Sequence, residues 1–463
     1  MFLTRRTALA GMAASSALPM APTRALAEDD ATATAIRDLL IASKSRYEAA
    51  ITHIDQRRGD DLIAPLIFAL RYTPNSEEPI LALLHGMTGN HTARTWHEWM
   101  LWQEAHPEHV PHPAFIDMKR DVFLSIDPYF DVFLKPEHLK RERMKIRFEE
   151  IAWGGVRKDG IPSIDNPILV GADAPEAEYL LDTDLVFGVS INGDARAYPL
   201  RIMGWHEMFN DTIGGVPLAM AYCTLCGSGI LFETGGIKGF EEPLVFGSSG
   251  FLYRSNKLMF DRQTHSLWNQ FTGKPVSGDL VDSGIELKQR PIAIAPWKDW
   301  KEKNPETKVI TLRTGFSRDY GSGVVYRDYF ASPNLMFPAQ VDESRLKQKE
   351  YVFGVRIFGG AKAWALKAFE GGRVLNDEVA GNPLVLIGNT AGRTVRAYER
   401  NNLRFTAGRN PEELIAEGDQ IWTVKEETLV GPDGAKLPRV AGHIAYWFAW
   451  DGYLGAESEF FAG

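Results

Sequence analysis

The stretch "AYCTLCGSGILFE" holds the only two cysteines of this 463-residue chain, Cys223 and Cys226. Two sulfurs separated by two residues can form a disulfide, exchange with other thiols, or bind a soft metal ion. Apolar, β-prone segments flank the pair, so we expect it at the tip of a β-hairpin. Two glycines, Gly227 and Gly229, follow at once and favour a tight turn over the helix N-terminus that activates thiols in many redox proteins.

A turn of this kind presents two thiolates to one ion, and we expect a thiophilic transition metal, copper or zinc. The predicted third ligand is His206, in "GWHEMFND". Two carboxylates in the same motif, Glu207 and Asp211, are the predicted catalytic groups, as a proton shuttle or as anchors for the histidine. Other donors in the sequence that suit copper or zinc are Met203, Met208, Met220 and His265.

Two other functions remain open on the same residues. The first is a thiol–disulfide oxidoreductase in which Cys223 is the attacking thiol and no metal is held. The second is a non-enzymatic binding module that uses the polar hairpin expected over residues 246–273. A purely structural disulfide is less favoured, because a C-x-x-C bridge closes a very small loop and stabilises little.

An internal repeat provides a comparison within the chain. Residues 186–233 and 352–399 align without a gap and share motifs such as "VFGV" and the Asn-Asp pair. At the positions of Cys223, Cys226 and His206, the second copy has Asn389, Gly392 and Gly372. We therefore expect one working site, in the first module, and a structural second module. Asp211 persists as Asp377, which favours a structural role for that residue.

The N-terminus resembles an export signal. Arg5 and Arg6 precede an Ala- and Leu-rich stretch that ends in the small-x-small sequence Ala25-Leu26-Ala27. The paired arginines favour the twin-arginine route, which carries folded proteins. We predict cleavage after Ala27 and a periplasmic location, where thiols are oxidised, metal-bound or protected.

Charge and hydropathy restrict the partners. The formal net charge is −9, and cleavage would remove three arginines and no acids. An acidic chain without a basic stripe argues against a nucleic-acid partner. No other stretch is apolar and long enough to span a bilayer, so we expect no membrane span in the mature protein. The expected partner is a small molecule or a metal-trafficking protein.

The domain organisation follows from these patterns. Helical periodicity and short apolar blocks predict a helical domain over residues 28–150, including a charged helix at "PEHLKRERMKIRFEEIAW". Six of the eleven histidines lie between His85 and His112, in a spacing that fits no rigid ligand set. A β-rich module is expected over 151–312, a linker over 313–348 and a second, degenerate module over 349–463. The fold class is α+β, with a helical N-terminal region and two related β-rich repeat modules.

Several motifs together resemble an exported bacterial and archaeal family catalogued as domain of unknown function 3179. They cover roughly residues 150–463, and they are "DGIPSIDNP", "ARAYPL", "WHEMFNDTIGGVP", "YCTLCGSGILF", "FGSSGFLYRSNKLMFDR", "SLWNQFTG" and "TGFSRDYG". Family members usually have proline after the first cysteine, where this chain has Thr224. The resemblance implies that His206, Glu207, Cys223 and Cys226 belong to a shared motif, and it supplies no reaction.

Overall fold

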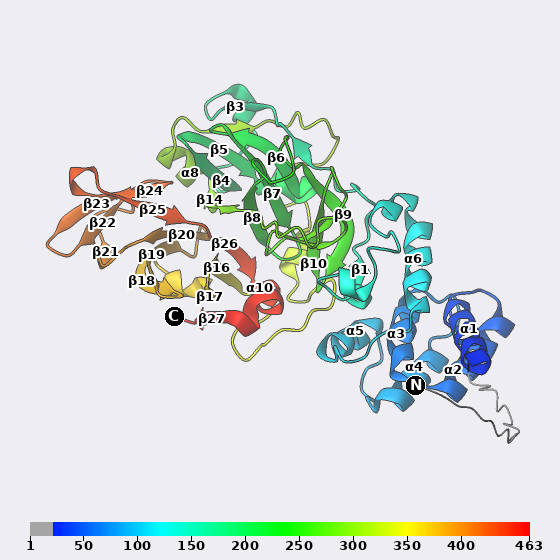
Figure 1. Ribbon diagram of the computed structural model, residues 1–463. Coiled ribbons are helices and arrows are strands. Elements are labelled where there is room, and N and C mark those ends of the chain that lie inside the picture. Colours follow the sequence, from blue (N-terminus) through cyan, green and yellow to red (C-terminus); the bar gives the residue numbers. More distant parts are fainter. Residues whose placement is uncertain (1–21) are drawn as a thin grey trace, which may run out of the picture. The chain divides into compact units, whose positions relative to one another are not determined.

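A computed structural model describes residues 22–463 (Figure 1), with side chains described from residue 29 onward except at position 433. The paired arginines of the predicted export signal lie outside this part. The chain divides into two compact units. The smaller contains the residues up to Thr92 together with Val110–Met118, and the larger contains Ala93–His109 and Lys119–Gly463. None of the helices in the described part is long and apolar enough to cross a membrane.

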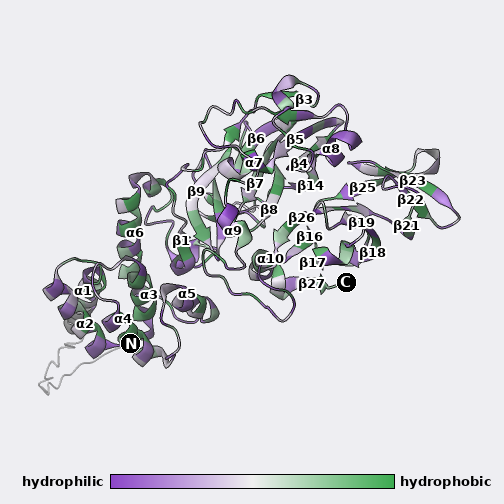
Figure 2. Ribbon diagram, turned by 180° about the vertical axis from the view of Figure 1, so that it is seen from behind, coloured by the Kyte–Doolittle hydropathy of each residue, from purple (hydrophilic) through white to green (hydrophobic). Residues whose placement is uncertain are grey.

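The smaller unit is helical, as the sequence predicts. Its helices are α1 (Pro22–Asp38), α2 (Lys44–Arg57), α3 (Ile63–Tyr72), α4 (Glu78–Thr88) and the first turn of α6 (Ala114–Ile126). The centre is α3, whose residues from Ile63 to Leu70 are all buried, and it is green in Figure 2. A helix that is apolar on every side needs neighbours on every side, and the surrounding helices provide them.

The segment before the first module departs from the sequence prediction. The charged stretch 136–153 is not a helix; it forms two short 3-10 turns, η3 (Arg141–Arg143) and η4 (Phe148–Glu150), and then β1 (Ile151–Trp153). The buried ammonium of Lys119 holds this chain by donating to the carbonyls of Phe148 and Glu149, at 2.6 and 3.2 Å. Tertiary contacts therefore override the local preference of a sequence that lacks a continuous apolar stripe.

The first module consists of three five-stranded sheets. One has the order β14-β4-β5-β15-β3, the second β13-β8-β7-β6-β2, and the third β1-β9-β10-β11-β12. The strands that matter for the site are β6 (Met208–Ile213), β7 (Val216–Cys223), β8 (Ser228–Glu233), β9 (Phe246–Tyr253) and β10 (Asn256–Asp261). β7, β9 and β10 contain almost only buried residues, which is why their sequences read as continuous apolar runs.

The second module repeats the first in a reduced form. Its four-stranded sheet has the order β26-β16-β17-β27, which matches β14-β4-β5-β15 of the first module. Within these four strands, the pairings β5–β15 and β17–β27 are parallel and the others are antiparallel. The bounds are β4 (Leu185–Ile191), β5 (Asp194–Pro199), β14 (Ala293–Pro296), β15 (Lys308–Ile310), β16 (Tyr351–Ile357), β17 (Gly360–Ala365), β26 (His443–Tyr446) and β27 (Ser458–Phe461).

The meander of the first module is repeated as well. β18 (Arg373–Val379), β19 (Asn382–Asn389) and β20 (Thr394–Glu399) correspond to β6, β7 and β8, and they continue into an eight-stranded sheet. The predicted pair of related β-rich modules is thus confirmed. Between the modules, the only helix of residues 313–348 is α9 (Arg327–Ala331).

A glycine–tryptophan contact is the shared packing element of the two modules. A short helix follows the edge strand in each copy, α8 (Trp297–Lys303) and α10 (Trp447–Leu454). In the first copy the indole of Trp300 lies directly on Gly188, and in the second the indole of Trp450 lies on Gly354. A Cβ at either glycine would overlap the indole ring. The sheet therefore needs glycine at this position so that the buried tryptophan can seat against the strand.

This contact predicts that Gly354→Ala destabilises the protein. Because the added methyl overlaps a fully buried ring, we expect a loss of about 2 kcal/mol or more in the free energy of unfolding, measured by urea denaturation. Gly171→Ala is the matched control, since a Cβ there meets open space. Equal stability of the two variants would contradict the packing described here.

Candidate functional site

The two cysteines lie in the turn of the β7–β8 hairpin, as the sequence predicts. β7 ends at Cys223, which pairs with Ser228 at the start of β8. Inside the turn, the N–H of Cys226 donates to the carbonyl of Cys223 at 3.1 Å, and that of Gly227 to Thr224 at 3.3 Å. The two sulfurs form a disulfide. Both cysteines are buried, Cys223 being 2% and Cys226 0% exposed.

The second module covers this turn. The backbone N–H of Tyr446 in β26 donates to the carbonyl of Cys226 at 2.7 Å. The rings of Tyr446 and Tyr351 stack at 4.5 Å and face Gly227, where a Cβ would come within 3.0 Å of Tyr351. Gly227 also has a φ of 59°, in the left-handed region. Glycine is required here both for the turn and for the close approach of the second module.

The linker contacts the same turn. The hydroxyl of Tyr329, in α9, donates to the carbonyl of Leu225 at 2.6 Å. Lys349 lies over the ring of Tyr329, with Nζ 3.8 Å from its centroid, and donates to the carbonyl of Ser332 at 2.6 Å. The disulfide turn is therefore enclosed by the first module, the linker and the second module together.

A buried ion pair lies beside the disulfide turn. Nζ of Lys257, in β10, is 2.9 Å from Oε2 of Glu207. The hydroxyl of Thr224, between the two cysteines, donates to Oε1 of the same carboxylate at 2.8 Å, and Tyr326 approaches it at 3.4 Å. Burial lowers the pKa of Lys257, and the Glu207 carboxylate opposes that shift. A buried charge pair is expensive to desolvate, so its place next to a disulfide points to chemistry.

A polar side chain also faces the sulfur of Cys226. Oδ1 of Asn256 lies 3.1 Å from Cys226 Sγ, and the carbonyl oxygen of Ser255 lies 3.6 Å from it. The amide nitrogen of Asn256 has no hydrogen-bond partner within the described part of the chain. An amide can accept from a thiol through its oxygen or, after rotation, donate to a thiolate through its nitrogen. Asn256 therefore suits both protonation states of a reduced Cys226.

His206 is engaged elsewhere. Its ring is fully buried, Nδ1 donates to the carbonyl of Pro162 at 2.9 Å, and Nε2 accepts from the hydroxyl of Tyr320 at 2.6 Å. Burial lowers the pKa of this imidazole, with a further contribution from Arg318, so the neutral ring is favoured. Between residues 22 and 463, no group of three His, Cys, Asp or Glu side chains is placed to hold a metal ion. The predicted set of Cys223, Cys226 and His206 is thus not brought together as ligands.

Asp211, predicted as a catalytic candidate, is bonded by residues at the same two repeat positions as its counterpart in the second module. Its Oδ2 accepts from the Tyr198 hydroxyl at 2.5 Å and from the Arg196 guanidinium at 2.6 Å. In the second module, Asp377 accepts from the indole of Trp364 at 2.7 Å and from Lys362 at 2.8 Å. Equivalent bonds in both copies make this carboxylate a brace between neighbouring strands.

Sequence reasoning missed Lys257 and Asn256. Both belong to the 246–273 segment, which forms β9, β10 and β11 (Leu267–Asn269) as predicted for a polar hairpin region. In the sequence they are two polar residues at the start of an apolar strand, and no spacing connects them to the cysteines. Only the pairing of β9 with β10 and the approach of that hairpin to the β7–β8 turn reveal them.

The comparison with protein families identifies relatives of the β-rich modules. Residues 158–457, well over half of the chain, match the model of a protein family of unknown function, DUF3179. The chain belongs to this family. No curated protein and no solved structure matches it. The DUF3179 match covers the disulfide turn, Glu207, Lys257 and the parts of both modules that enclose them.

The buried pair predicts a non-additive effect on stability. Lys257→Met and Glu207→Gln each leave an uncompensated polar group inside the protein, so we expect each to cost about 3–5 kcal/mol in urea unfolding. The double variant should lose less than the sum of the two, because it removes both partners. Lys288→Met is the control, since its partner Glu233 forms an ion pair at the surface. Additive losses would show that the two residues do not interact.

Proposed function

We propose that the protein is a thiol–disulfide oxidoreductase whose active group is the Cys223–Cys226 disulfide. The observation that carries the proposal is the buried Glu207–Lys257 pair at the disulfide turn, joined to it through the Thr224 hydroxyl. A simple staple needs no such pair, whereas disulfide exchange requires groups that deliver and accept protons. The second module, which has Asn389 and Gly392 in place of the cysteines, has Arg373 at the position of Glu207.

The proposed reaction is the oxidation of a dithiol. One thiolate of the dithiol attacks Cys223 Sγ, the Cys223–Cys226 bond breaks, and Cys226 leaves as a thiolate beside Asn256. The second thiolate of the dithiol then attacks the mixed disulfide, so the dithiol leaves as a disulfide and Cys223 is released. Two electrons and the two thiol protons pass from the dithiol to the cysteine pair. Cys223 is taken as the sulfur attacked, because Cys226 is the one that faces Asn256, whose amide can donate to a leaving thiolate.

Glu207 and Lys257 would serve as the proton-carrying pair in this reaction. The leaving Cys226 thiolate needs a proton or a nearby positive charge, and Lys257 is connected to the disulfide turn through Glu207 and Thr224. Transfer of a proton from Lys257 leaves a neutral amine next to the Glu207 carboxylate. Burial favours this transfer, because it lowers the pKa of Lys257. Glu207 and Thr224 would then position the amine for reprotonation.

Metal handling is the alternative on the same sulfurs. It requires the reduced pair together with ligands beyond those that the described residues bring together, since His206 is bonded to Pro162 and Tyr320. We therefore derive no step through copper or zinc. Metal content is instead a measured outcome of the experiment below.

The redox proposal predicts a labile disulfide in the folded protein. In glutathione or dithiothreitol buffers, the pair should equilibrate with a reduction potential above about −300 mV, the level below which structural disulfides usually lie. Alkylation and intact-mass analysis report this without ambiguity, because the chain has no other cysteine. We expect Glu207→Gln to slow reduction and Lys288→Met to leave its rate unchanged.

Two outcomes would overturn the redox proposal. A disulfide that is reduced only when the protein unfolds would be a structural staple. One copper or zinc ion per chain, bound to the reduced wild type and absent from the Cys223→Ser/Cys226→Ser variant, would assign metal handling instead. Elemental analysis of protein purified without chelators or affinity metal supplies that measurement.

We further propose that the protein is exported to the periplasm by the twin-arginine route. The support is the Arg5-Arg6 pair, the small-x-small sequence ending at Ala27, and a disulfide that is compatible with an oxidising compartment.

The export proposal predicts a mature chain that begins at Glu28. Mass spectrometry of protein from the periplasmic fraction checks this N-terminus, and the Arg5→Lys/Arg6→Lys variant should accumulate as uncleaved precursor in the cytoplasm. Cleaved protein in the periplasm at normal yield from that variant would contradict the route.

A further inference from the structure

A second polar site lies in the larger unit, at a cavity lined by residues of α5 (Trp96–Ala105), η4 and the β9–β10 turn. Its polar lining is Glu104, Glu150, Arg254 and Ser255, and two aromatic residues, Trp96 and Phe337, form part of the wall. Trp96 is only half-buried and the Arg254 side chain is 28% exposed, so the cavity reaches solvent.

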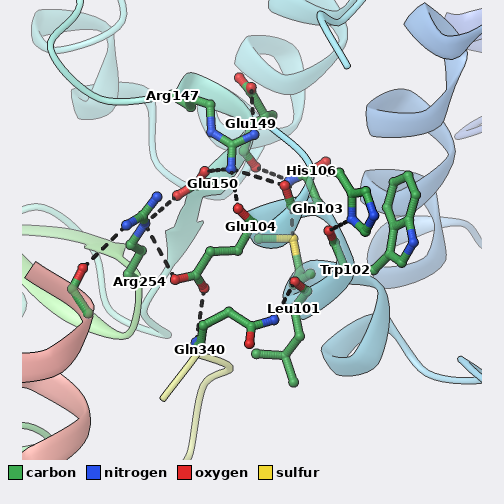
Figure 3. A network of polar contacts seen from close by, with 12 residues as sticks. Leu101, Trp102, Gln103, Glu104, His106, Arg147, Glu149, Glu150, Arg254 and Gln340 are labelled. Carbon is green, nitrogen blue, oxygen red and sulfur yellow. Dashed lines mark hydrogen bonds and ion pairs between the residues drawn. The ribbon is translucent and has the colours of Figure 1, made fainter. Parts of the chain in front are cut away.

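Of the two carboxylates that line the cavity, Glu104 has the longer ion pair with Arg254. Arg254 Nε is 2.8 Å from Glu150 Oε2 but 3.5 Å from Glu104 Oε1, and Arg147 also bonds Glu150 (Figure 3). Within the described part of the chain, the one further hydrogen bond to Glu104 comes from the backbone N–H of Gln340, at 3.1 Å. Burial, with a contribution from Glu150, raises the pKa of Glu104 to about 7 against the opposing charges of Arg254 and Arg147.

Ser255 provides an independent sign of a missing ligand. It is 4% exposed and lines the cavity, and its hydroxyl has no hydrogen-bond partner within the described residues. A buried hydroxyl without a partner costs free energy that a bound polar group would recover. The cavity thus combines an under-compensated carboxylate, an unused hydroxyl and aromatic faces.

We propose that this cavity, whose free volume of about 10 Å³ admits a group the size of one water molecule, binds the primary ammonium head group of a small organic molecule whose carbon chain stays outside. An ammonium has three N–H donors and one positive charge, which match the Glu104 carboxylate and the Ser255 oxygen, and the rings of Trp96 and Phe337 add cation–π attraction. Arg254 and Arg147 pair with Glu150, so the Glu104 carboxylate is the negative charge that remains for a cation. A quaternary ammonium has no N–H to donate, so it cannot use the hydroxyl.

Binding is coupled to protonation of Glu104. The bound ammonium favours the carboxylate form of Glu104. Without the ligand, Glu104 is mostly the neutral acid below pH 7. Binding at pH 5.5 therefore releases a proton and is weaker than at pH 8. The charged groups that face Glu104 and set this balance are Arg254, Arg147 and Glu150.

Calorimetric titration of the mature chain with butylammonium chloride, at constant ionic strength, tests the proposal. We expect saturable binding of one ion per chain, about tenfold or more tighter at pH 8 than at pH 5.5, and weaker binding of tetramethylammonium. Glu104→Gln should weaken binding about tenfold or more and remove the pH dependence, and Ser255→Ala should weaken it less. The control is Glu108→Gln, on a side chain that is 61% exposed, which should bind as wild type does.

Two results would overturn the proposal. The first is a butylammonium titration that gives no saturable heat beyond that of a sodium chloride control titration, and the second is an unchanged affinity for butylammonium in Glu104→Gln. If Glu104→Gln does not fold, titration of the wild type at pH 6.5 in two different buffers still tests the role of Glu104. Binding there must release protons from Glu104, and the buffer takes them up, so the measured heat must differ between the buffers. Heat that is independent of the buffer rejects the role of Glu104. The site shares only the β9–β10 turn with the disulfide hairpin, so this test and the redox test fail separately.

Discussion

The hydrogen bond from the Tyr446 N–H to the Cys226 carbonyl is the contact on which the rest of the site depends. A hairpin turn carries backbone groups that normally face water, and here the second module satisfies one of them directly. Once β26 is docked in this way, the rings of Tyr351 and Tyr446 close over Gly227. The disulfide is then excluded from solvent, and the electrostatics around it become those of a protein interior.

Exclusion of water changes what the neighbouring charges can do. At the surface, a Lys–Glu pair is screened and contributes little, as expected for Lys288 and Glu233. Inside, Lys257 and Glu207 depend on each other, and a change at either one is felt by the Thr224 hydroxyl within the turn. The same low polarity raises the pKa of Glu104 beside the cavity at α5, because burial there outweighs the opposing charges of Arg254 and Arg147.

Local patterns in the sequence predicted much of the fold, because they reflect burial along single strands and helices. The hairpin around Cys223 and Cys226, the helical N-terminal region and the two related modules are confirmed by the structure. The helix predicted over residues 136–153 was wrong, because Lys119 and the buried glutamates of η4 hold that segment in another conformation. Its many Lys, Arg and Glu residues favour a helix only in the absence of such contacts.

The site was less predictable than the fold. Glu207 was found because it shares a motif with His206, yet the two side chains bond different partners. Asn256 and Lys257 come from a strand some thirty positions beyond the cysteines, and only tertiary pairing brings them to the turn. Copper or zinc at the cysteine pair stays a prediction, and so do the export route and the partner molecules.

The way in which β26 covers the disulfide turn ties the two copies together. The second copy has Asn389 and Gly392 where the first has its cysteines, yet its Tyr446 and Tyr351 form the cover over Gly227. The two copies therefore carry different constraints: the first must keep the residues of the turn, and the second must keep the surface that fits them. Deleting the second module would expose the disulfide to water without removing either sulfur.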